Sequence, residues 1–395
     1  MNTQLLIDRF MEKYGEAEQE LRIFNAPGRV NLIGEHLDYN GGYVLPAALE
    51  FGTTLLIRPR KDGKISFAST NLPYEAVVSA EPDFGGKSGE WTDYPVGVIT
   101  ELSKLDIRLS QGYDLLYHGD IPNGAGLSSS ASIEVVTAYA LMTMEGQPVD
   151  TVEISKLSQR AENLFVGVNS GIMDQFAVAN GKRNHAILLM CDTLEYELVP
   201  FETGDYKIVI GNTNKRRGLV DSKYNERRSE CDRALEMLQA KVPELRYLAE
   251  LNPVSFAEVA DAITDETVLK RAKHVVEENQ RVLDSVAALK NDDLEAFGQF
   301  MNQSHDSLRY QYEVTGDELD AMVEEAQRVP GTLGSRMTGA GFGGCTVSLV
   351  HQDAVEEFIR EVGSRYEART GLKPDFYVCG VGQGVHEMTE VKEGN

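Results

Sequence analysis

The sequence lacks any long hydrophobic run, and this absence excludes one class of protein. No apolar stretch approaches the roughly 18 residues that a membrane-spanning helix requires. The first 22 residues also lack the apolar centre and the small-residue cleavage site of a secretory signal, and they predict an amphipathic helix instead. We therefore expect a cytoplasmic protein that makes no contact with membranes.

Cysteine and histidine are too scattered to predict a metal centre built from them. The four cysteines are far apart, at 191, 231, 345 and 379, and none has the paired spacing of a zinc site or a redox dithiol. The seven histidines form no cluster of the HExxH type. Four free thiols in a reducing compartment are expected, and a catalytic zinc site is not.

Basic residues are outnumbered, since 38 lysines and arginines stand against 62 aspartates and glutamates and give a formal charge of -24. Such a surface argues against nucleic acid and anionic membranes as partners. An anionic substrate would have to be received by a local cationic site or as a magnesium complex. Any buried arginine or hard metal ligand is therefore of interest.

The length of 395 residues predicts about two domains, and the composition, with 42% hydrophobic and 25% charged residues, is that of an ordered globular chain. Runs of strands and runs of helices follow one another without regular alternation, which indicates an α+β fold. The turn at 202–205 is the expected domain boundary. Strands are predicted at 53–58, 64–68, 113–118, 186–190, 206–210, 345–350 and 376–381. Helices are predicted after Ser128 and near Thr151, and at 221–241, 265–290, 294–310 and 317–328.

The most informative segment is 28–42, which places Arg29, Glu35, His36 and Asp38 in an apolar frame punctuated by glycine. Buried charges cost several kcal/mol unless they are paired or hydrogen-bonded. A small polyhydroxylated ligand would supply partners, because carboxylates accept from hydroxyls and an arginine offers a fork of donors to an anion. The alternative is a buried ion-pair network at a turn, without a ligand.

A second segment, 120–132, is rich in glycine and serine and lies between a predicted strand and a predicted helix. Its glycines let the backbone approach a ligand closely, and its serines are expected to cap the helix. Free N–H groups at a helix start favour phosphate. The segment therefore predicts a nucleotide-binding loop, with an ordinary serine-capped helix start as the alternative.

Glycine-rich segment 339–344 fits the GxGxxG pattern, but it leads into the predicted strand 345–350. A dinucleotide-binding fingerprint has to lead into a helix, so that interpretation is disfavoured. The Walker A pattern also fails, because Glu81 stands where a glycine is required ahead of Gly86, Lys87 and Ser88.

These three segments together resemble the galactokinase family of the GHMP kinases. Segment 28–39 is similar to the sugar-recognition signature of galactokinases, and segment 336–344 resembles the third motif of the superfamily. The superfamily motif P-x-x-x-G-L-x-S-S-A is met by Pro122, Gly126, Leu127, Ser129, Ser130 and Ala131. The resemblance implies a two-domain GHMP kinase fold, with mixed sheets, packed helices and the active site in the cleft between an N-terminal domain (1–203) and a C-terminal domain (204–395).

The resemblance also implies roles for individual residues. Asp174 matches the catalytic base and Arg29 lies between it and the transferred phosphoryl group, although Asp174 alone would be interpreted as a turn aspartate. The implied sugar-binding residues are Glu35, His36, Leu37, Asp38, Gly171 and Tyr224. The implied ATP-binding residues are Gly124, Ala125, Gly126, Leu127, Ser128, Ser129, Ser130 and Trp91. Ser130 and Glu162 are the implied magnesium ligands.

Three of these residues have plain structural alternatives. Glu162 lies beside an apolar stripe that includes Ile154 and Leu157, so on its own it would be a solvated helix flank. Tyr224 would be a tyrosine on a helix surface. Trp91, the single tryptophan, would serve core packing.

The implied activity is the magnesium-dependent transfer of a phosphoryl group from ATP to the C1 hydroxyl of α-D-galactose, giving galactose 1-phosphate and ADP, the first step of the Leloir pathway. A monomer that binds galactose and ATP is expected. Two alternatives stay open: a kinase for another sugar such as N-acetylgalactosamine, and a non-catalytic sensor of galactose and ATP. Such sensors are altered in the segment that corresponds to 120–132, which we call the serine loop, whereas Ser130, Ala131 and Ser132 are intact here.

Overall fold

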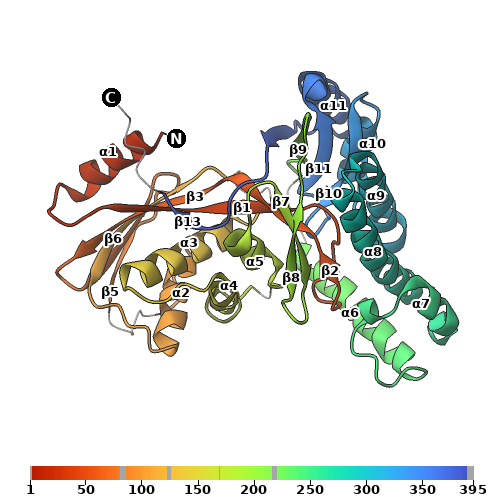
Figure 1. The fold of residues 1–395 in the computed structure, drawn as a ribbon, viewed down its shortest axis with the longest axis horizontal. Helices are drawn as coiled ribbons and strands as arrows, with labels where there is room; N and C mark the ends of the chain where they lie inside the picture. The colour runs from red at the N-terminus through yellow and green to blue at the C-terminus, as the bar shows by residue number, and fades with distance from the viewer. Residues whose placement is uncertain (1, 81–85, 122–125, 169, 216–219, 389–395) are drawn as a thin grey trace.

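The chain folds into three sheets that lie along the long axis of the molecule, with helices packed on their faces (Figure 1). The computed structural model describes residues 2–80, 86–121, 126–168, 170–215 and 220–388. Predicted loop residues Gly124 and Ala125 lie outside these ranges. The arrangement is α+β, as the sequence predicts.

A six-stranded mixed sheet dominates the first half, in the order β13-β1-β3-β6-β4-β5. Only β4 and β6 pair in parallel within it. Its strands are β1 (Arg22–Asn31), β3 (Pro46–Arg60), β4 (Lys64–Ser69), β5 (Ala76–Ser79), β6 (Gly112–Gly119) and β13 (His386–Glu387). The strand from the far end of the chain thus completes the edge of the first sheet.

Two antiparallel sheets follow, of three and four strands. The smaller one, in the order β2-β7-β8, contains β2 (Tyr43–Val44), β7 (His185–Met190) and β8 (Tyr196–Pro200). The larger one, in the order β10-β11-β9-β12, contains β9 (Tyr206–Asn212), β10 (Thr332–Thr338), β11 (Cys345–His351) and β12 (Asp375–Cys379). The glycine-rich segment 339–344 therefore joins two antiparallel strands, which excludes the dinucleotide-binding interpretation.

Helices cover both faces of the first sheet because successive side chains of a strand point to opposite faces. On β3, Leu55 and Ile57 pack in one core with α2 and α3, whereas Leu56 packs with α1. The helices of this half are α1 (Thr3–Tyr14), α2 (Asp93–Lys104), α3 (Ser129–Met144), α4 (Thr151–Arg160) and α5 (Met173–Asn180), and a π-helix at Ala161–Val166 continues α4.

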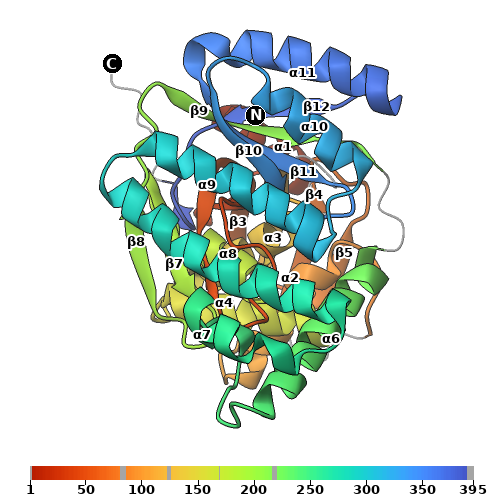
Figure 2. The ribbon, with the colours of Figure 1, turned by 90° about the vertical axis from the view of Figure 1, so that its right-hand side faces the viewer.

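Long helices pack on the four-stranded sheet of the second half, and Figure 2 shows α8 and α9 facing the viewer. Its α-helices are α6 (Val220–Gln239), α7 (Pro253–Val259), α8 (Glu266–Lys290), α9 (Leu294–Ser307), α10 (Asp317–Gln327) and α11 (Val355–Thr370). Shorter helical turns lie at Leu248–Glu250, Ala260–Ala262, Leu308–Tyr312 and Gln352–Ala354. The largest hydrophobic core joins the two halves, since Val30 and Leu37 pack in one cluster with Val275 of α8.

Every strand and helix predicted from the sequence is present, and most ends differ by a few residues, although β3 begins at Pro46 and is longer than the predicted 53–58. One prediction is wrong in extent. The amphipathic helix expected over the first 22 residues ends at Tyr14, because Gly15 adopts a positive φ of 73° and its N–H bonds back to Met11. Arg22 already belongs to β1.

Candidate active site

Arg29 and Asp174, which are 145 residues apart in the chain, form a two-pronged ion pair. Arg29 donates from Nε and a terminal nitrogen to the two carboxylate oxygens at 2.8 and 2.7 Å, and its other terminal nitrogen donates to the Gly126 carbonyl at 2.8 Å. The arginine side chain is 8% exposed and the aspartate side chain 29%. The structure thus brings the sugar-signature segment, the serine loop and the start of α5 to one point.

A glycine lets the serine loop come this close to β1. A Cβ atom on Gly28 would lie 2.8 Å from the Leu127 carbonyl oxygen, which is the atom that accepts the Arg29 N–H at 3.2 Å. The pairing of β1 with β3 also shifts register between Pro27 and Arg29, a bulge of the kind that re-aims side chains. The local sequence therefore turns Arg29 toward the loop.

The sequence predicts that the Ser128 side chain caps α3, but the structure shows a different hydrogen bond. Ser128 is the N-cap residue of α3, but its side chain makes no capping hydrogen bond and its backbone is left-handed. Its hydroxyl instead donates to the Asp174 carboxylate at 2.6 Å. The expectation that this serine caps the helix is wrong, because a charged acceptor makes the stronger bond.

Glu162 is buried, so the alternative of a solvated helix flank is wrong. It lies in the π-helix Ala161–Val166 and is 5% exposed. One of its carboxylate oxygens accepts from the Ser170 hydroxyl at 2.5 Å and from the Gln175 amide at 2.8 Å, and the Ser130 hydroxyl also bonds to it. Burial raises the pKa of Glu162, and these hydrogen bonds partly oppose that effect.

The pairing of Ser130 with Glu162 fits a magnesium ion in its chemistry. Hydroxyl and carboxylate oxygens are hard donors, and Mg²⁺ binds through few protein ligands while it keeps waters and nucleotide phosphates. Across the described residues, no group of three or more histidines, cysteines, aspartates or glutamates has the arrangement of a self-contained metal site. Any cation here would thus need ligands from the nucleotide and from water.

Glu35 contacts residues of segment 336–344. Its carboxylate contacts the Arg336 guanidinium, which is completely buried, and accepts from the Thr338 hydroxyl at 3.2 Å and the Gly339 N–H at 3.0 Å. Burial raises the pKa of Glu35, while Arg336 and the Gly339 N–H act against that shift. Glu35 is therefore part of a buried ion-pair network, as the alternative to a ligand site predicts. The pairing of Arg336 with Glu35 was not predicted from the sequence.

His36 lies in a cluster of tyrosines. Its backbone has a positive φ of 64°, and its Nδ1 lies 2.9 Å from the Tyr39 hydroxyl, which in turn lies 2.7 Å from the Tyr312 hydroxyl. The Tyr224 ring is half-buried with its centroid 5.7 Å from that of His36, so Tyr224 is more than a surface residue of α6. Burial, followed by the charge of His274, lowers the pKa of His36 to about 3, which makes it a neutral hydrogen-bonding group near pH 7.

Asp38 and Gly171 lie against each other. A Cβ atom on Gly171 would be only 2.3 Å from an Asp38 carboxylate oxygen. Burial, followed by the charge of Asp174, raises the pKa of Asp38 to about 6. Leu37, by contrast, is a completely buried core residue whose carbonyl accepts the N–H groups of Asn40 and Gly42, so any contact with a sugar would be made by its backbone.

If Asp38 binds the sugar, as the resemblance to galactokinases implies, Gly171→Ala should raise the KM for galactose by about 10- to 100-fold, because the new methyl group displaces the Asp38 carboxylate and misplacement by about 1 Å can cost that much. The KM for ATP should change little. Gly363→Ala is a matched control, since its Cβ would meet only Phe376 at an ordinary 3.4 Å. Steady-state kinetics with each substrate varied in turn measure the effect. An unchanged KM for galactose would show that Asp38 does not bind the sugar.

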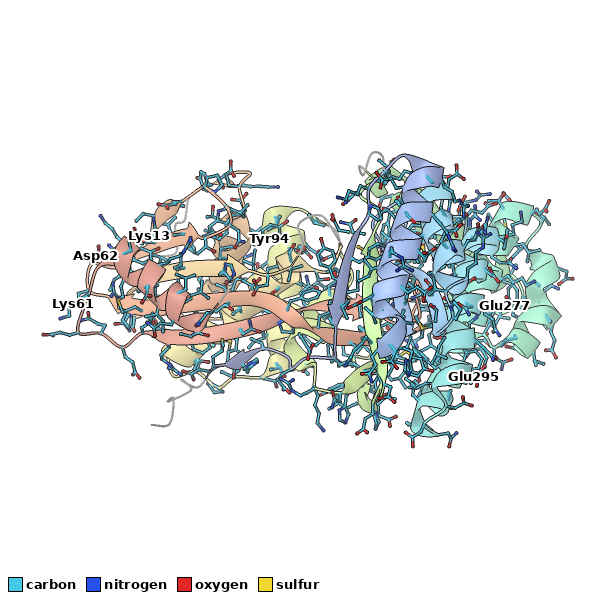
Figure 3. The ribbon with its side chains drawn as sticks, turned by 90° about the horizontal axis from the view of Figure 1, so that it is seen from above. Lys13, Lys61, Asp62, Tyr94, Glu277 and Glu295 are labelled. Carbon is cyan, nitrogen blue, oxygen red and sulfur yellow. The ribbon has the colours of Figure 1, made fainter. Side chains whose placement is uncertain are left out.

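Trp91 is packed in the core and also lines a cavity. It is 9% exposed, packs edge-on against Tyr117 and donates from its indole N–H to the Tyr74 carbonyl at 2.8 Å. It also lines a cavity of about 170 Å³ together with Tyr94, Ser129 and Ser130. Figure 3 shows Tyr94 near the middle of the long axis of the molecule. An aromatic pocket thus adjoins the start of α3, where the serine loop ends.

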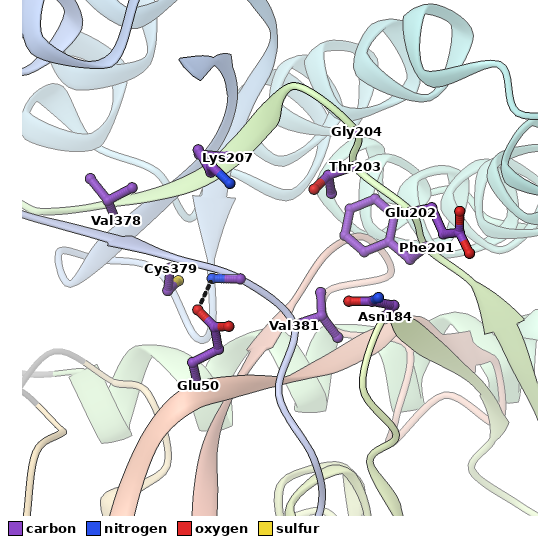
Figure 4. A pocket seen from close by; sticks show the side chains of 11 residues that line it. Glu50, Asn184, Phe201, Glu202, Thr203, Gly204, Lys207, Val378, Cys379 and Val381 are labelled. Atoms are coloured by element: carbon purple, nitrogen blue, oxygen red, sulfur yellow. Dashed lines mark hydrogen bonds between the residues drawn. The ribbon is translucent and has the colours of Figure 1, made fainter. Parts of the chain in front are cut away.

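A larger cavity of about 590 Å³ contains none of the predicted site residues. It lies where Glu50 of β3 faces β9 and β12, and the Glu50 carboxylate accepts the Gly380 N–H at 2.8 Å (Figure 4). Its walls include residues 202–204 of the turn predicted as the domain boundary. Arg29 and Asp174 therefore do not line this cavity.

None of the helices in the described ranges combines the length and the apolar character needed to cross a membrane.

Three family models match the chain. A galactokinase galactose-binding signature matches residues 8–59, the GHMP kinases N terminal domain matches residues 93–182, and the GHMP kinases C terminal matches residues 285–368. A galactokinase of Fusobacterium nucleatum is 51% identical over 388 residues, which cover 97% of this chain and 99% of that protein. A galactokinase of Halalkalibacterium halodurans is 50% identical over 384 residues, which cover 97% of each.

Solved structures agree with these matches. The galactokinase of Lactococcus lactis, crystallised with galactose, superimposes with a TM-score of 0.92 at 44% identity over 98% of this chain and 99% of that one. The mevalonate kinase of Methanococcus jannaschii, at 19% identity and a TM-score of 0.68 over 93% of this chain, shares the fold.

Proposed function

Because this chain belongs to the galactokinase family, we propose that it transfers the terminal phosphoryl group of ATP to the C1 hydroxyl of α-D-galactose, giving galactose 1-phosphate and ADP. The observation that supports the proposal most directly is the ion pair of Arg29 and Asp174 beside Gly126. This observation supports the proposal because a carboxylate and a guanidinium lie together next to the serine loop.

Asp174 receives or orients the proton of the sugar hydroxyl as the hydroxyl oxygen attacks the terminal phosphorus of ATP, and ADP leaves with the bridging oxygen. Arg29 stabilises the negative charge that redistributes over the phosphoryl oxygens. Positioning and charge stabilisation dominate phosphoryl transfer, so these two residues suffice as the protein's contribution at the reacting atoms.

We assign recognition of the sugar to Glu35, His36, Asp38 and Tyr224, with Gly171 and the backbone of Leu37 completing the site. The supporting observations are the closeness of Asp38 to Gly171 and the packing of Tyr224 on His36. A site built on hydrogen bonds discriminates strongly against an analogue that lacks one hydroxyl, because its own buried groups are then left unpaired.

We assign ATP binding to residues 124–130 of the serine loop and to the cavity beside Trp91. Mg²⁺ would be held by Ser130 and Glu162, whose side chains are hydrogen-bonded to each other. The ion neutralises phosphate charge when it is bound.

Glu162→Ala should raise the Mg²⁺ concentration needed for half-maximal activity, with partial recovery of kcat at high Mg²⁺ and little change in the KM for galactose. The reason is that a metal ligand is lost while the sugar site is untouched. Activity measured against free Mg²⁺ tests this. Glu153→Ala, on the exposed side of α4 where Glu153 pairs with Lys156, is the control. Wild-type magnesium dependence in Glu162→Ala would leave Glu162 a structural carboxylate.

The proposed activity is tested with a panel of sugars, each offered with ATP and Mg²⁺ to the purified protein. We expect the highest kcat/KM for galactose, with galactose 1-phosphate identified by ³¹P NMR. A higher value for N-acetylgalactosamine would make the protein a kinase for that sugar. Binding of galactose and ATP without turnover would make it a sensor.

We further propose that the chain divides into domains at residues 1–203 and 204–395 and acts as a monomer in the cytoplasm.

A further inference from the structure

Glu134 is a buried carboxylate that the proposed mechanism does not use. It is the single charged residue among the 16 of α3 and is completely buried. One carboxylate oxygen accepts from the Gln175 amide at 3.2 Å. The other oxygen has no hydrogen-bond partner among the described residues. Buried polar atoms are normally satisfied, so this oxygen requires an explanation.

Gln175 joins Glu134 to the residue assigned to the metal. Its amide nitrogen donates to Glu162 at 2.8 Å as well as to Glu134 at 3.2 Å. The glutamine is itself completely buried, and its amide oxygen also lacks a partner within the described part of the chain. The carboxylates of Glu134 on α3 and Glu162 on the π-helix therefore both accept from the Gln175 amide nitrogen. One Glu134 carboxylate oxygen and the Gln175 amide oxygen have no hydrogen-bond partner among the described residues.

The cluster has no cation of its own within the described ranges. No lysine or arginine there forms an ion pair or a hydrogen bond with Glu134 or Glu162. Removing a charge from water without a partner costs several kcal/mol. Two buried carboxylates around one neutral amide would therefore be stabilised by a positive group from outside the chain.

We propose that Glu134 is a positioning residue of the magnesium site, held outside the set of direct ligands by Gln175. Its unpartnered oxygen accepts hydrogen bonds from water molecules that accompany the cation, and its other oxygen fixes the amide that orients Glu162. Mg²⁺ retains several waters in proteins, and partners of this outer kind orient the direct ligands. The inference rests on the proposed function, since it assumes a nucleotide-bound cation at Glu162.

The test is the affinity of Mn²⁺ for the complex of the full chain with ADP, measured by the electron paramagnetic resonance signal of free Mn²⁺. Glu134→Gln keeps the shape but removes the charge, and we expect Mn²⁺ to bind about 10- to 100-fold more weakly, as for other outer partners of metal ligands. The affinity for galactose, measured by calorimetry, should stay within about twofold of that of the wild type. Glu101→Gln is the control, because Glu101 is 3% exposed on α2 and pairs with Lys104 and Arg160. It should leave Mn²⁺ binding unchanged.

Unchanged Mn²⁺ affinity in Glu134→Gln would overturn the inference, and so would equal losses of Mn²⁺ and galactose affinity, which indicate a general structural role. If Glu134→Gln does not fold, Gln175→Met gives a second measurement, because it removes the shared donor at similar volume. Weaker Mn²⁺ binding in that variant supports the inference and wild-type binding overturns it. Absence of galactose phosphorylation by the wild type would refute the proposed function, whereas normal activity with unaltered Mn²⁺ binding in the variants would refute this inference alone.

Discussion

Asp174→Asn should lower kcat by about 10²- to 10⁴-fold, the usual range for the loss of a group that transfers a proton. The amide keeps the size of the side chain but does not accept a proton at neutral pH. It also disturbs the ion pair with Arg29, because an amide NH₂ would replace one of the two oxygens to which the guanidinium donates. Galactose affinity should be largely retained, since the side chains assigned to the sugar, Glu35, His36, Asp38 and Tyr224, are themselves unchanged in this variant.

Steady-state kcat at saturating galactose and ATP measures the effect, with galactose binding followed separately by calorimetry. Asp150→Asn is a suitable control, because Asp150 caps α4 and asparagine caps a helix equally well. A variant Asp174→Asn that retains more than about a tenth of wild-type kcat would remove Asp174 from the chemical step.

Arg29→Ala should lower kcat by about 10²- to 10³-fold, the loss typical when a fixed donor to developing negative charge is removed. The effect on the KM for galactose should be smaller, because the guanidinium serves the transition state more than the ground state. Arg29→Lys retains the charge but not the planar fork that grips both oxygens of Asp174. We therefore expect it to recover only part of the lost activity.

The Arg29 variants need a control at another buried arginine, and Arg58 provides one. It is 3% exposed and pairs with Asp114 on the same sheet, away from the proposed site. Arg58→Lys should change the melting temperature but not kcat. Should Arg29→Ala raise only the KM for galactose, Arg29 would belong to a binding network and not to phosphoryl transfer.

The proximity of Arg29 to Asp174 could not be derived from the sequence by physical rules alone. Nothing in the local pattern of either residue specifies a partner 145 positions away, and Asp174 by itself would be interpreted as a turn aspartate. The resemblance to a known family supplied the pairing of these segments. What the local sequence did predict is that Arg29 and its charged neighbours are buried and need partners.

Glu162 shows why helical periodicity fails at one particular place. The α-helix ends at Arg160, and residues 161–166 continue with the wider turn of a π-helix, which changes the side chains that share a face. A stripe extrapolated with 3.6 residues per turn therefore misplaces Glu162. Glu134 was detectable in principle, since it is one charged residue in an otherwise uncharged helix.

Strands β1 and β10 were not predicted, and their composition explains this. Pro27 and Gly28 interrupt β1, and Gly334 and Arg336 lie in β10, so neither strand shows an uninterrupted run of the branched and aromatic residues typical of strands. Tertiary contacts decide both elements, because Arg336 is paired with Glu35 and Gly28 admits the Leu127 carbonyl.

Strand β13 has a consequence for the synthesis of the chain on the ribosome. Residues 384–388 bond to β1 and to the end of α5, although they are synthesised long after both of these elements. Translation at about 5–20 residues per second leaves β1 without this neighbour for some tens of seconds. An unpaired strand edge is a template for wrong association. The nascent N-terminal half thus depends on residues 384–388 for the protection of this edge, and a chain terminated before residue 384 would leave the edge exposed.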